Sequence, residues 1–204
     1  RNLKLSRSLR IAAFLPEQIA SFFDQVREGM RTAVTRVSGA HVELLFHTFP
    51  RLGVGDIECM EAADWCKYDG VLLAPGDPET VATLHRRTKN SRPPTVYIAS
   101  DAPRTSHLAS VAVDATVSGG MAAELLGRVL HSPMNVVAIT GDRKIQDHSA
   151  KLRGFAATLA IHAPHLILLP SIESHEHSDC AYAAALELFA KHKDLGGMYV
   201  STAD

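Results

Sequence analysis

Four side chains with binding chemistry lie close to the ends of short apolar segments. Asp77 and Asp101 each follow shortly after such a segment, while Phe22 and Phe23 come soon after the first one. A carboxylate at the end of a strand can accept hydrogen bonds from paired hydroxyl groups, although it can equally cap a turn. One phenylalanine can pack into the core while the other forms an apolar wall for the less polar face of a sugar ring.

The sequence motifs of nucleotide binding and of nucleophilic catalysis are absent from this sequence. Dinucleotide binding needs G-x-G-x-x-G directly after a strand, but the first apolar segment runs into L-P-E-Q at residues 15–18. The sequence contains neither a G-x-x-x-x-G-K-[ST] phosphate loop nor a G-x-S-x-G nucleophile elbow. We therefore expect no cofactor, no catalytic residue and no enzymatic activity.

One segment offers ligands that suit zinc. His175, Glu176, His177, Asp179 and Cys180 are chemically able to bind the ion, but they lack the paired spacing of structural zinc sites. The same residues fit a polar loop that leads into a helix, and we expect no metal site.

The elements that must position these residues alternate along the chain. The predicted strands are residues 9–15, 42–49, 71–74, 95–99, 109–113, 135–140, 166–170 and 198–200. The predicted helices are residues 22–37, 57–66, 79–88, 118–130, 148–162 and 179–192. This alternation indicates βαβ units and an α/β fold with parallel sheets flanked by helices. Ligands of such folds bind beyond the carboxyl ends of the strands.

Composition and charge restrict the class of protein. Lys+Arg total 21 and Asp+Glu total 22, and the formal net charge of −1 does not support nucleic-acid binding by this chain itself. No apolar run approaches the roughly 20 residues of a membrane span, and no signal peptide opens the chain. Three cysteines at irregular spacing do not indicate a disulfide framework. The cytoplasm fits best, although an exported chain that had lost its signal peptide would look the same.

The first ten residues are locally basic. Arg1, Lys4, Arg7 and Arg10 lie in a stretch without an acidic residue. Two interpretations are open: a solvated tail, or a linker to an upstream domain.

In residues 100–119, S-D-A-P surrounds Asp101, V-A-V-D ends at Asp114, and Ser118-Gly119 opens a predicted helix. This segment resembles the LacI/GalR family of bacterial transcription regulators. In that family a strand ends in a ligand-binding Asp, and a V-D-N-x-x-A-G stretch leads into a helix. The later segments G-D at 141–142 with K-L-R-G-F at 151–155, and residues 197–204, are similar to further family motifs, so that the resemblance extends from Leu9 to the last residue.

The resemblance implies positions for a ligand site. Lys151 stands where the family has a ligand-binding Arg, and a lysine offers a point charge instead of a bidentate fork. Asp147 precedes Lys151 by one helical turn, and Asp204 stands where the family often has Asn. The predicted ligand-binding residues are Phe22, Phe23, Asp77, Asp101, Asp147, Lys151 and Asp204.

The resemblance also implies a two-lobed fold, similar to type I periplasmic binding proteins, with the ligand between the lobes. Residues 1–8 would be the remnant of a hinge or linker, residues 9–130 the N-terminal lobe and residues 131–204 the C-terminal lobe. Because the chain stops on a strand and a bare loop, we expect the second lobe to be incomplete and a C-terminal part of the natural protein to be missing.

The function implied is effector sensing by a transcription regulator. A sugar or related small polar metabolite would bind between the lobes, and hinge closure would change the placement of paired DNA-binding headpieces. The expected partners are this effector, a second copy in a homodimer, and operator DNA reached only through a headpiece absent here; no membrane is expected. The alternative is a periplasmic sugar-binding protein of an ABC transporter, for which a signal peptide instead of a headpiece would precede the chain.

Overall fold

The computed structural model describes residues 7–88 and 92–202, and the chain divides into two compact units between Val111 and Ala112. The predictions made for Arg1, Lys4 and Asp204 therefore lie outside the described residues. Among the helices of the described ranges, none combines the length and the apolar character that a membrane crossing requires.

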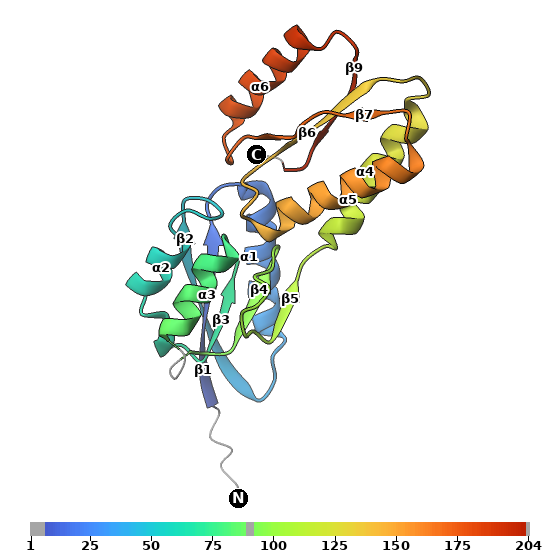
Figure 1. The fold of residues 1–204 in the computed structure, drawn as a ribbon. Coiled ribbons are helices and arrows are strands. Elements are labelled where there is room, and N and C mark those ends of the chain that lie inside the picture. Colours follow the sequence, from blue (N-terminus) through green and yellow to red (C-terminus); the bar gives the residue numbers. More distant parts are fainter. Residues whose placement is uncertain (1–6, 89–91, 203–204) are drawn as a thin grey trace, which may run out of the picture. The chain divides into compact units, whose positions relative to one another are not determined.

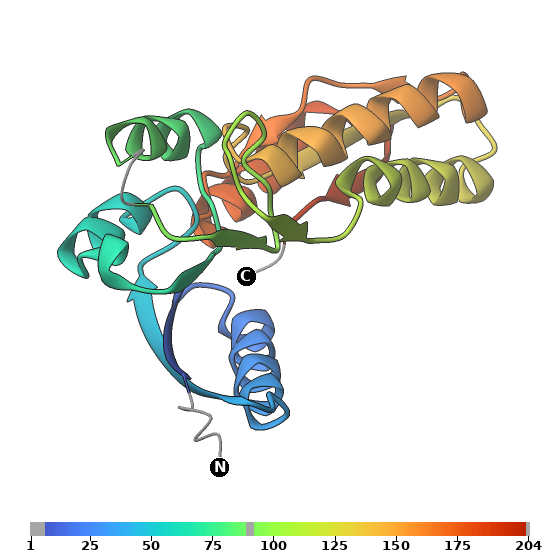
Figure 2. The same cartoon turned by 90° about the horizontal axis from the view of Figure 1, so that it is seen from below.

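The first unit is a parallel sheet with helices on both faces. Its elements are β1 (Arg7–Pro16), α1 (Ala20–Thr35), β2 (Ala40–Phe49), α2 (Asp56–Ala62), the 3₁₀ helix η1 (Trp65–Lys67), β3 (Gly70–Leu73), α3 (Pro78–Arg87), β4 (Thr95–Ile98) and β5 (Ala109–Val111). The strands follow the order β2-β1-β3-β4-β5, and every pair is parallel. Helix α1 covers one face of the sheet, and α2 and α3 cover the other (Figures 1 and 2).

The core of the first unit explains why the interior strand β1 contains a continuous apolar run. Ala12, Ala13, Phe14 and Leu15 of β1 are all fully buried, because β1 is paired on both edges and helices cover both faces. Alternation of apolar and polar residues is expected only where one face of a strand meets water. The strand predicted at residues 9–15 is thus confirmed.

The second unit is a smaller parallel sheet built around one strand. Its elements are α4 (Ala115–Val129), β6 (Asn135–Thr140), α5 (Gln146–His162), β7 (Ile167–Leu168), β8 (Ile172–Glu173), α6 (Ser178–Lys191) and β9 (Leu195–Val200). Strand β9 pairs with β6 from Asn135 to Ile139, while β7 and β8 pair with the two ends of β6. The prediction of an α/β fold with parallel sheets flanked by helices is confirmed.

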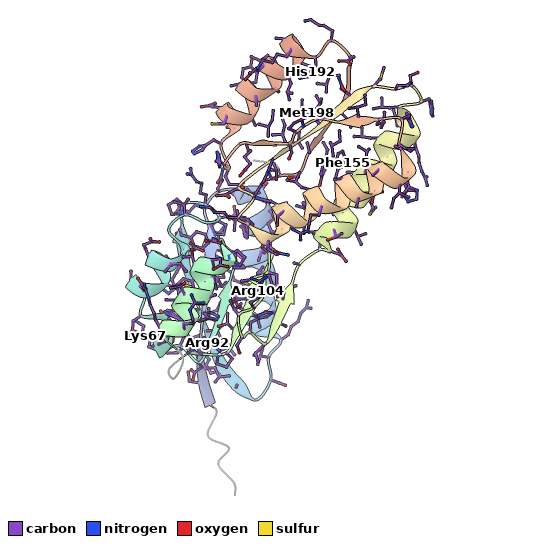
Figure 3. All side chains as sticks on the ribbon, viewed as in Figure 1. Lys67, Arg92, Arg104, Phe155, His192 and Met198 are labelled. Atoms are coloured by element: carbon purple, nitrogen blue, oxygen red, sulfur yellow. The ribbon has the colours of Figure 1, made fainter. Side chains whose placement is uncertain are left out.

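Strand β6 divides the core of the second unit into two clusters. Val136 and Ala138 pack with Phe155 of α5, whereas Val137 and Ile139 pack on the other face with Leu188 of α6. This two-residue period is the side-chain alternation of a strand. Figure 3 labels Phe155 on α5, in the first cluster, and Met198 on β9, which packs against the second.

Two details of the secondary structure differ from the prediction. The helix expected at 57–66 is interrupted, because Asp64 adopts a left-handed φ of 49° between α2 and η1. The strand expected at 166–170 is only two residues long, and β8, which follows it, was not predicted. Such short strands are held by pairing with β6, so they carry no periodic signal of their own.

The boundary between the units also differs from the prediction. We expected the helix at 118–130 in the N-terminal lobe, but α4 lies in the second unit. It packs along α5 so closely that Gly119 and Gly120 on α4 and Gly154 on α5 leave no room for a side chain. The change of unit therefore falls between β5 and α4.

Candidate functional site

Strained backbone marks the loops that follow several strands. Among the described residues, the non-glycine residues with left-handed φ in such loops are Ile19 after β1, Ala99 and Arg104 after β4, and His175 and Glu176 after β8; Asp64 is the remaining one. Each left-handed residue costs about 1–3 kcal/mol and persists only where its surroundings hold it in place. Because such strain is concentrated at ligand sites, these loops are candidate positions for functional residues.

Asp101 lies in the strained loop between β4 and β5. Its Oδ1 accepts hydrogen bonds from Ser110 Oγ (2.6 Å) and from the Ala102 amide (2.9 Å), and His107 Nε2 lies 3.6 Å away. The side chain is 39% exposed, and within the described residues no hydrogen bond reaches its Oδ2. The loop therefore orients one carboxylate oxygen and leaves the other able to accept a hydrogen bond from a ligand.

Ser100, the residue before Asp101, has a buried hydroxyl group that could bond to a ligand. The hydroxyl of Ser100 is buried and has no partner among the described residues. An orphaned buried polar group costs about 1–3 kcal/mol, so a ligand or an ordered water that bonded to it would gain that energy. The sequence could not predict that Ser100 lacks a hydrogen-bond partner, because burial and partners depend on the tertiary structure.

The two adjacent phenylalanines have different environments. Phe23 is 1% exposed and packs in the core, as expected for one ring of the pair, and its role as a ligand wall stays a prediction. Phe22 is 47% exposed, and its ring meets that of Phe23 edge to face at 5.0 Å. The helix turns by about 100° from one residue to the next, which places one ring inside and leaves the other available to stack on a ligand.

Asp77 is occupied by the helix that follows it. Its Oδ1 accepts from the Glu79 amide (3.1 Å) and its Oδ2 from Thr80 Oγ1 (2.8 Å), so that it caps the first turn of α3. Of the two roles considered for Asp77 from the sequence, ligand binding or the capping of a turn, these hydrogen bonds correspond to the cap. The cap accounts for the position of Asp77 without a ligand.

A charged pair lies at the carboxyl ends of β6 and β9 in the second unit. Lys151 Nζ lies 2.7 Å from Asp147 Oδ2 and donates to the carbonyl oxygen of Ser201 (3.2 Å). The side chains of Lys151 and Asp147 are 18% and 11% exposed, so solvent still reaches them. Beside them, Ser201 Oγ donates to Thr140 Oγ1 at 2.8 Å. The structure thus brings two predicted residues together and adds two hydroxyl groups that were not predicted.

Tyr199 adds a phenol to this polar group. Burial, and secondarily the negative charge of Asp147, raise the pKa of Tyr199, while a hydrogen bond with Ser118 opposes the shift. Its ring stacks on that of Phe155 at 4.8 Å. The phenol therefore stays protonated near neutral pH and can donate a hydrogen bond.

A buried histidine–glutamate pair supports the loop after β6. His148 Nδ1 lies 3.2 Å from Glu176 Oε1 and 3.0 Å from the carbonyl oxygen of Asp142, whose amide donates to the same Oε1 at 3.1 Å. A methyl group on Gly141 would lie 1.6 Å from this carboxylate oxygen, so any larger residue there would displace the Glu176 side chain. Glu176 therefore anchors the loop that precedes Asp147, a role the sequence did not reveal.

The described residues contain no group of three or more His, Cys, Asp or Glu side chains placed to hold a metal ion. Asp204, the last predicted ligand residue, is outside the described residues.

Comparison with known proteins identifies a family for nearly the whole chain. The family described as periplasmic binding protein domain matches residues 11–204. No curated protein sequence matches this chain.

Solved structures that are similar in fold include sugar-binding and solute-binding proteins. An ABC transporter solute-binding protein from Agrobacterium vitis, bound with α-D-tagatopyranose, is 18% identical with a TM-score of 0.83; the match covers 96% of this chain and 68% of that one. A glucose-galactose binding protein from Geobacillus stearothermophilus is 22% identical with a TM-score of 0.82, over 96% and 69% of the two chains. A solute-binding protein from Burkholderia graminis, in complex with D-arabinose, is 18% identical with a TM-score of 0.82, over 97% and 67%.

Proposed function

Since the chain belongs to the periplasmic binding protein domain family, we propose that it binds a neutral sugar through side chains at the carboxyl ends of its strands. The observation that carries this proposal is the Asp147–Lys151 pair. Its carboxylate accepts hydrogen bonds and its ammonium donates them, as the hydroxyl groups of a sugar require. Because the two charges compensate each other at 2.7 Å, the pair favours a neutral polyol over an anion.

Features of the first unit support the same ligand class. Oδ2 of Asp101, which accepts no hydrogen bond from the described residues, suits a hydroxyl donor, and the exposed ring of Phe22 suits the apolar face of a sugar ring. The similar structures named above carry α-D-tagatopyranose or D-arabinose, or are described as binding glucose and galactose. All of these ligands are uncharged.

We propose transport as the biological setting, with the chain acting as a solute receptor for an ABC importer. Support comes from the similar structures, several of which are ABC transporter solute-binding proteins. The second candidate is the effector module of a LacI/GalR-type regulator in the cytoplasm. It is favoured by the basic residues Arg1, Lys4, Arg7 and Arg10 and by the motifs around Asp101 and Lys151. In that setting a homodimer would bind operator DNA through an N-terminal headpiece.

The ligand class is tested by calorimetric titration with neutral sugars and with sugar phosphates. We expect the wild type to bind a neutral sugar and to reject its phosphate ester. Asp147→Asn leaves the positive charge of Lys151 uncompensated. The substitution should therefore weaken the binding of the neutral sugar and strengthen the binding of its phosphate ester. A wild type that prefers the phosphate ester would contradict the proposal.

A matched control separates the site from general charge effects. Glu187 and Lys191 form a pair with the same i,i+4 spacing on α6, where both side chains are more than 60% exposed. Glu187→Gln should leave both affinities unchanged. The setting is tested by sequencing the gene upstream of the codon for Arg1: a signal peptide supports the transport receptor, and a helix-turn-helix segment supports the regulator.

A further inference from the structure

The second unit contains an open pocket on the side of α5 away from the charged pair. The pocket has a volume of about 550 Å³ and lies between α5 and residues 168–171. It is lined on the helix by Ser149 and Arg153, each two residues beyond Asp147 and Lys151 respectively. Two residues correspond to about 200° around a helix, so the two sets of side chains project in nearly opposite directions.

The pairing of the strands also separates the pocket from the Asp147–Lys151 pair. Strand β7, whose Leu168 lines the pocket, pairs with β6 at Asn135 and Val136. Strand β9 pairs with those same two residues of β6. Because a strand has only two edges, β7 and β9 lie on opposite edges of β6. Ser201, which accepts from Lys151, follows β9, so this pocket is a different place from the proposed sugar site.

The pocket carries an excess of positive charge. Arg143 Nη2 donates to Ser171 Oγ at 2.6 Å, while its Nε lies 3.4 Å from Glu173 Oε1. Arg153 is exposed and donates to Ser149 Oγ at 3.2 Å, and no acidic side chain of the described ranges pairs with it. Two guanidinium groups and one carboxylate leave one positive charge without a partner. A guanidinium presents a planar fork of donors that matches a carboxylate or a phosphate.

The rest of the pocket is apolar. Leu152 and Ala156 of α5 face Leu168, Leu169 and Pro170 across it. A volume of this size is in the range of small-molecule sites, which combine apolar walls with a few polar groups that fix the orientation of the ligand. A bare inorganic ion would use the guanidinium of Arg153 but not these walls.

We propose that this pocket is a second binding site, which takes a small organic oxyanion: one carboxylate or phosphate group attached to an apolar body. The oxyanion contacts Arg153, with the hydroxyl groups of Ser149 and Ser171 beside it, and the apolar body lies against Leu152 and Leu168. The site is independent of the sugar site and is unaffected if the proposed function fails.

The test is a titration of the isotope-labelled protein by NMR with phenyl phosphate, benzoate, benzyl alcohol and inorganic phosphate. Phenyl phosphate or benzoate should shift the amide signals of Ser149, Leu169 and Ser171, and the tighter of the two identifies the oxyanion. Benzyl alcohol lacks the charge and inorganic phosphate lacks the apolar body, so each should bind at least about tenfold more weakly. Equal binding of either one, or no shift of these amides with any probe, would overturn the proposal.

Variants locate the site. Arg153→Gln should weaken the better anion about tenfold, and Arg153→Lys should restore part of the affinity because it keeps the charge. Arg128→Gln, on the exposed surface of α4, and Lys151→Gln, in the proposed sugar site, should leave the affinity unchanged. Wild-type affinity in Arg153→Gln, or a loss in Lys151→Gln equal to that in Arg153→Gln, would refute the site. Because the Arg153 side chain is exposed, the substitution should not unfold the protein, and unchanged circular dichroism verifies this.

Discussion

Gly119 on α4 and Lys151 on α5 meet backbone to backbone: a methyl group built on Gly119 would lie 1.9 Å from the carbonyl oxygen of Lys151. The reciprocal contact is equally close, because a methyl group on Gly154 would lie 1.9 Å from the carbonyl oxygen of Thr116. The two glycines let the helices touch along their backbones. This packing sets the position of α5, and with it the positions of Asp147 and Lys151.

Gly119→Ala should therefore destabilise the protein. The methyl group would have to push the two helices apart, and overpacking of this kind costs about 1–3 kcal/mol. Gly29→Ala on α1 is the matched control, because nothing lies within 4 Å of a methyl group there. That control should be neutral or stabilising by up to about 1 kcal/mol. Urea unfolding followed by circular dichroism measures both, and an unchanged midpoint for Gly119→Ala would show that the helices are not in contact.

Phe22→Ala should mainly weaken sugar binding, whereas Phe23→Ala should mainly lower the stability of the protein. Removal of the buried Phe23 ring should cost about 3–5 kcal/mol of unfolding free energy. Removal of the exposed Phe22 ring should cost less than about 1 kcal/mol but weaken the affinity for the sugar. The free energy comes from denaturant unfolding and the affinity from calorimetry. A Phe22→Ala variant with full affinity would remove Phe22 from the proposed site.

Asp77→Ala should lower stability without changing the affinity for the sugar. Loss of a helix N-cap costs about 1 kcal/mol, and both oxygens of this carboxylate are used by α3. Asp77→Ser keeps an acceptor for the cap and should restore most of the stability. If Asp77→Ser remains as unstable as Asp77→Ala, or if either substitution abolishes binding, the role of Asp77 is not that of a cap.

His85 should make the first unit sensitive to acid. Its ring is buried and stacked between Trp65 (5.7 Å) and Tyr97 (6.4 Å), and neither ring nitrogen has a hydrogen-bond partner among the described residues. Burial, with smaller contributions from Arg92 and His107, lowers the pKa of His85 from 6.5 to about 4. The folded state therefore keeps this ring neutral, while the unfolded state takes up a proton below about pH 6.5.

The direction of the pH effect on stability follows from this difference between the folded-state and unfolded-state pKa of His85. Protonation favours the unfolded state, so stability should fall as the pH decreases from about 6.5 to 4, by roughly 1–3 kcal/mol from this residue. His85→Phe keeps the aromatic stack and removes the titrating group. Trp65 is the only tryptophan of the chain, so its fluorescence reports the unfolding. If the wild type and His85→Phe lose stability in parallel over this pH range, His85 is not responsible.

The elements of the fold were predictable because their patterns are local. The apolar runs that form β1 and β6 and the apolar spacing of α1 depend only on near neighbours in the chain. The two outcomes left open for Asp77 were also local, since a cap is made to residues two and three positions further on. The position of Asp101 after a strand follows from the same patterns.

Tertiary structure decided the features that depend on distant partners. Adjacent residues on α1 have the same local pattern, and only the packing of the helix on its sheet buried Phe23 and exposed Phe22. The assignment of α4 to the second unit depends on its contact with α5, in which the touching residues, such as Gly119 and Lys151, lie more than 30 positions apart in the sequence. The pocket beside Arg153 is formed by α5 and residues 168–171, and the buried His148–Glu176 pair joins α5 to the loop after β8. Burial and pairing of this kind are contacts between distant segments, so a pattern read along the chain does not contain them.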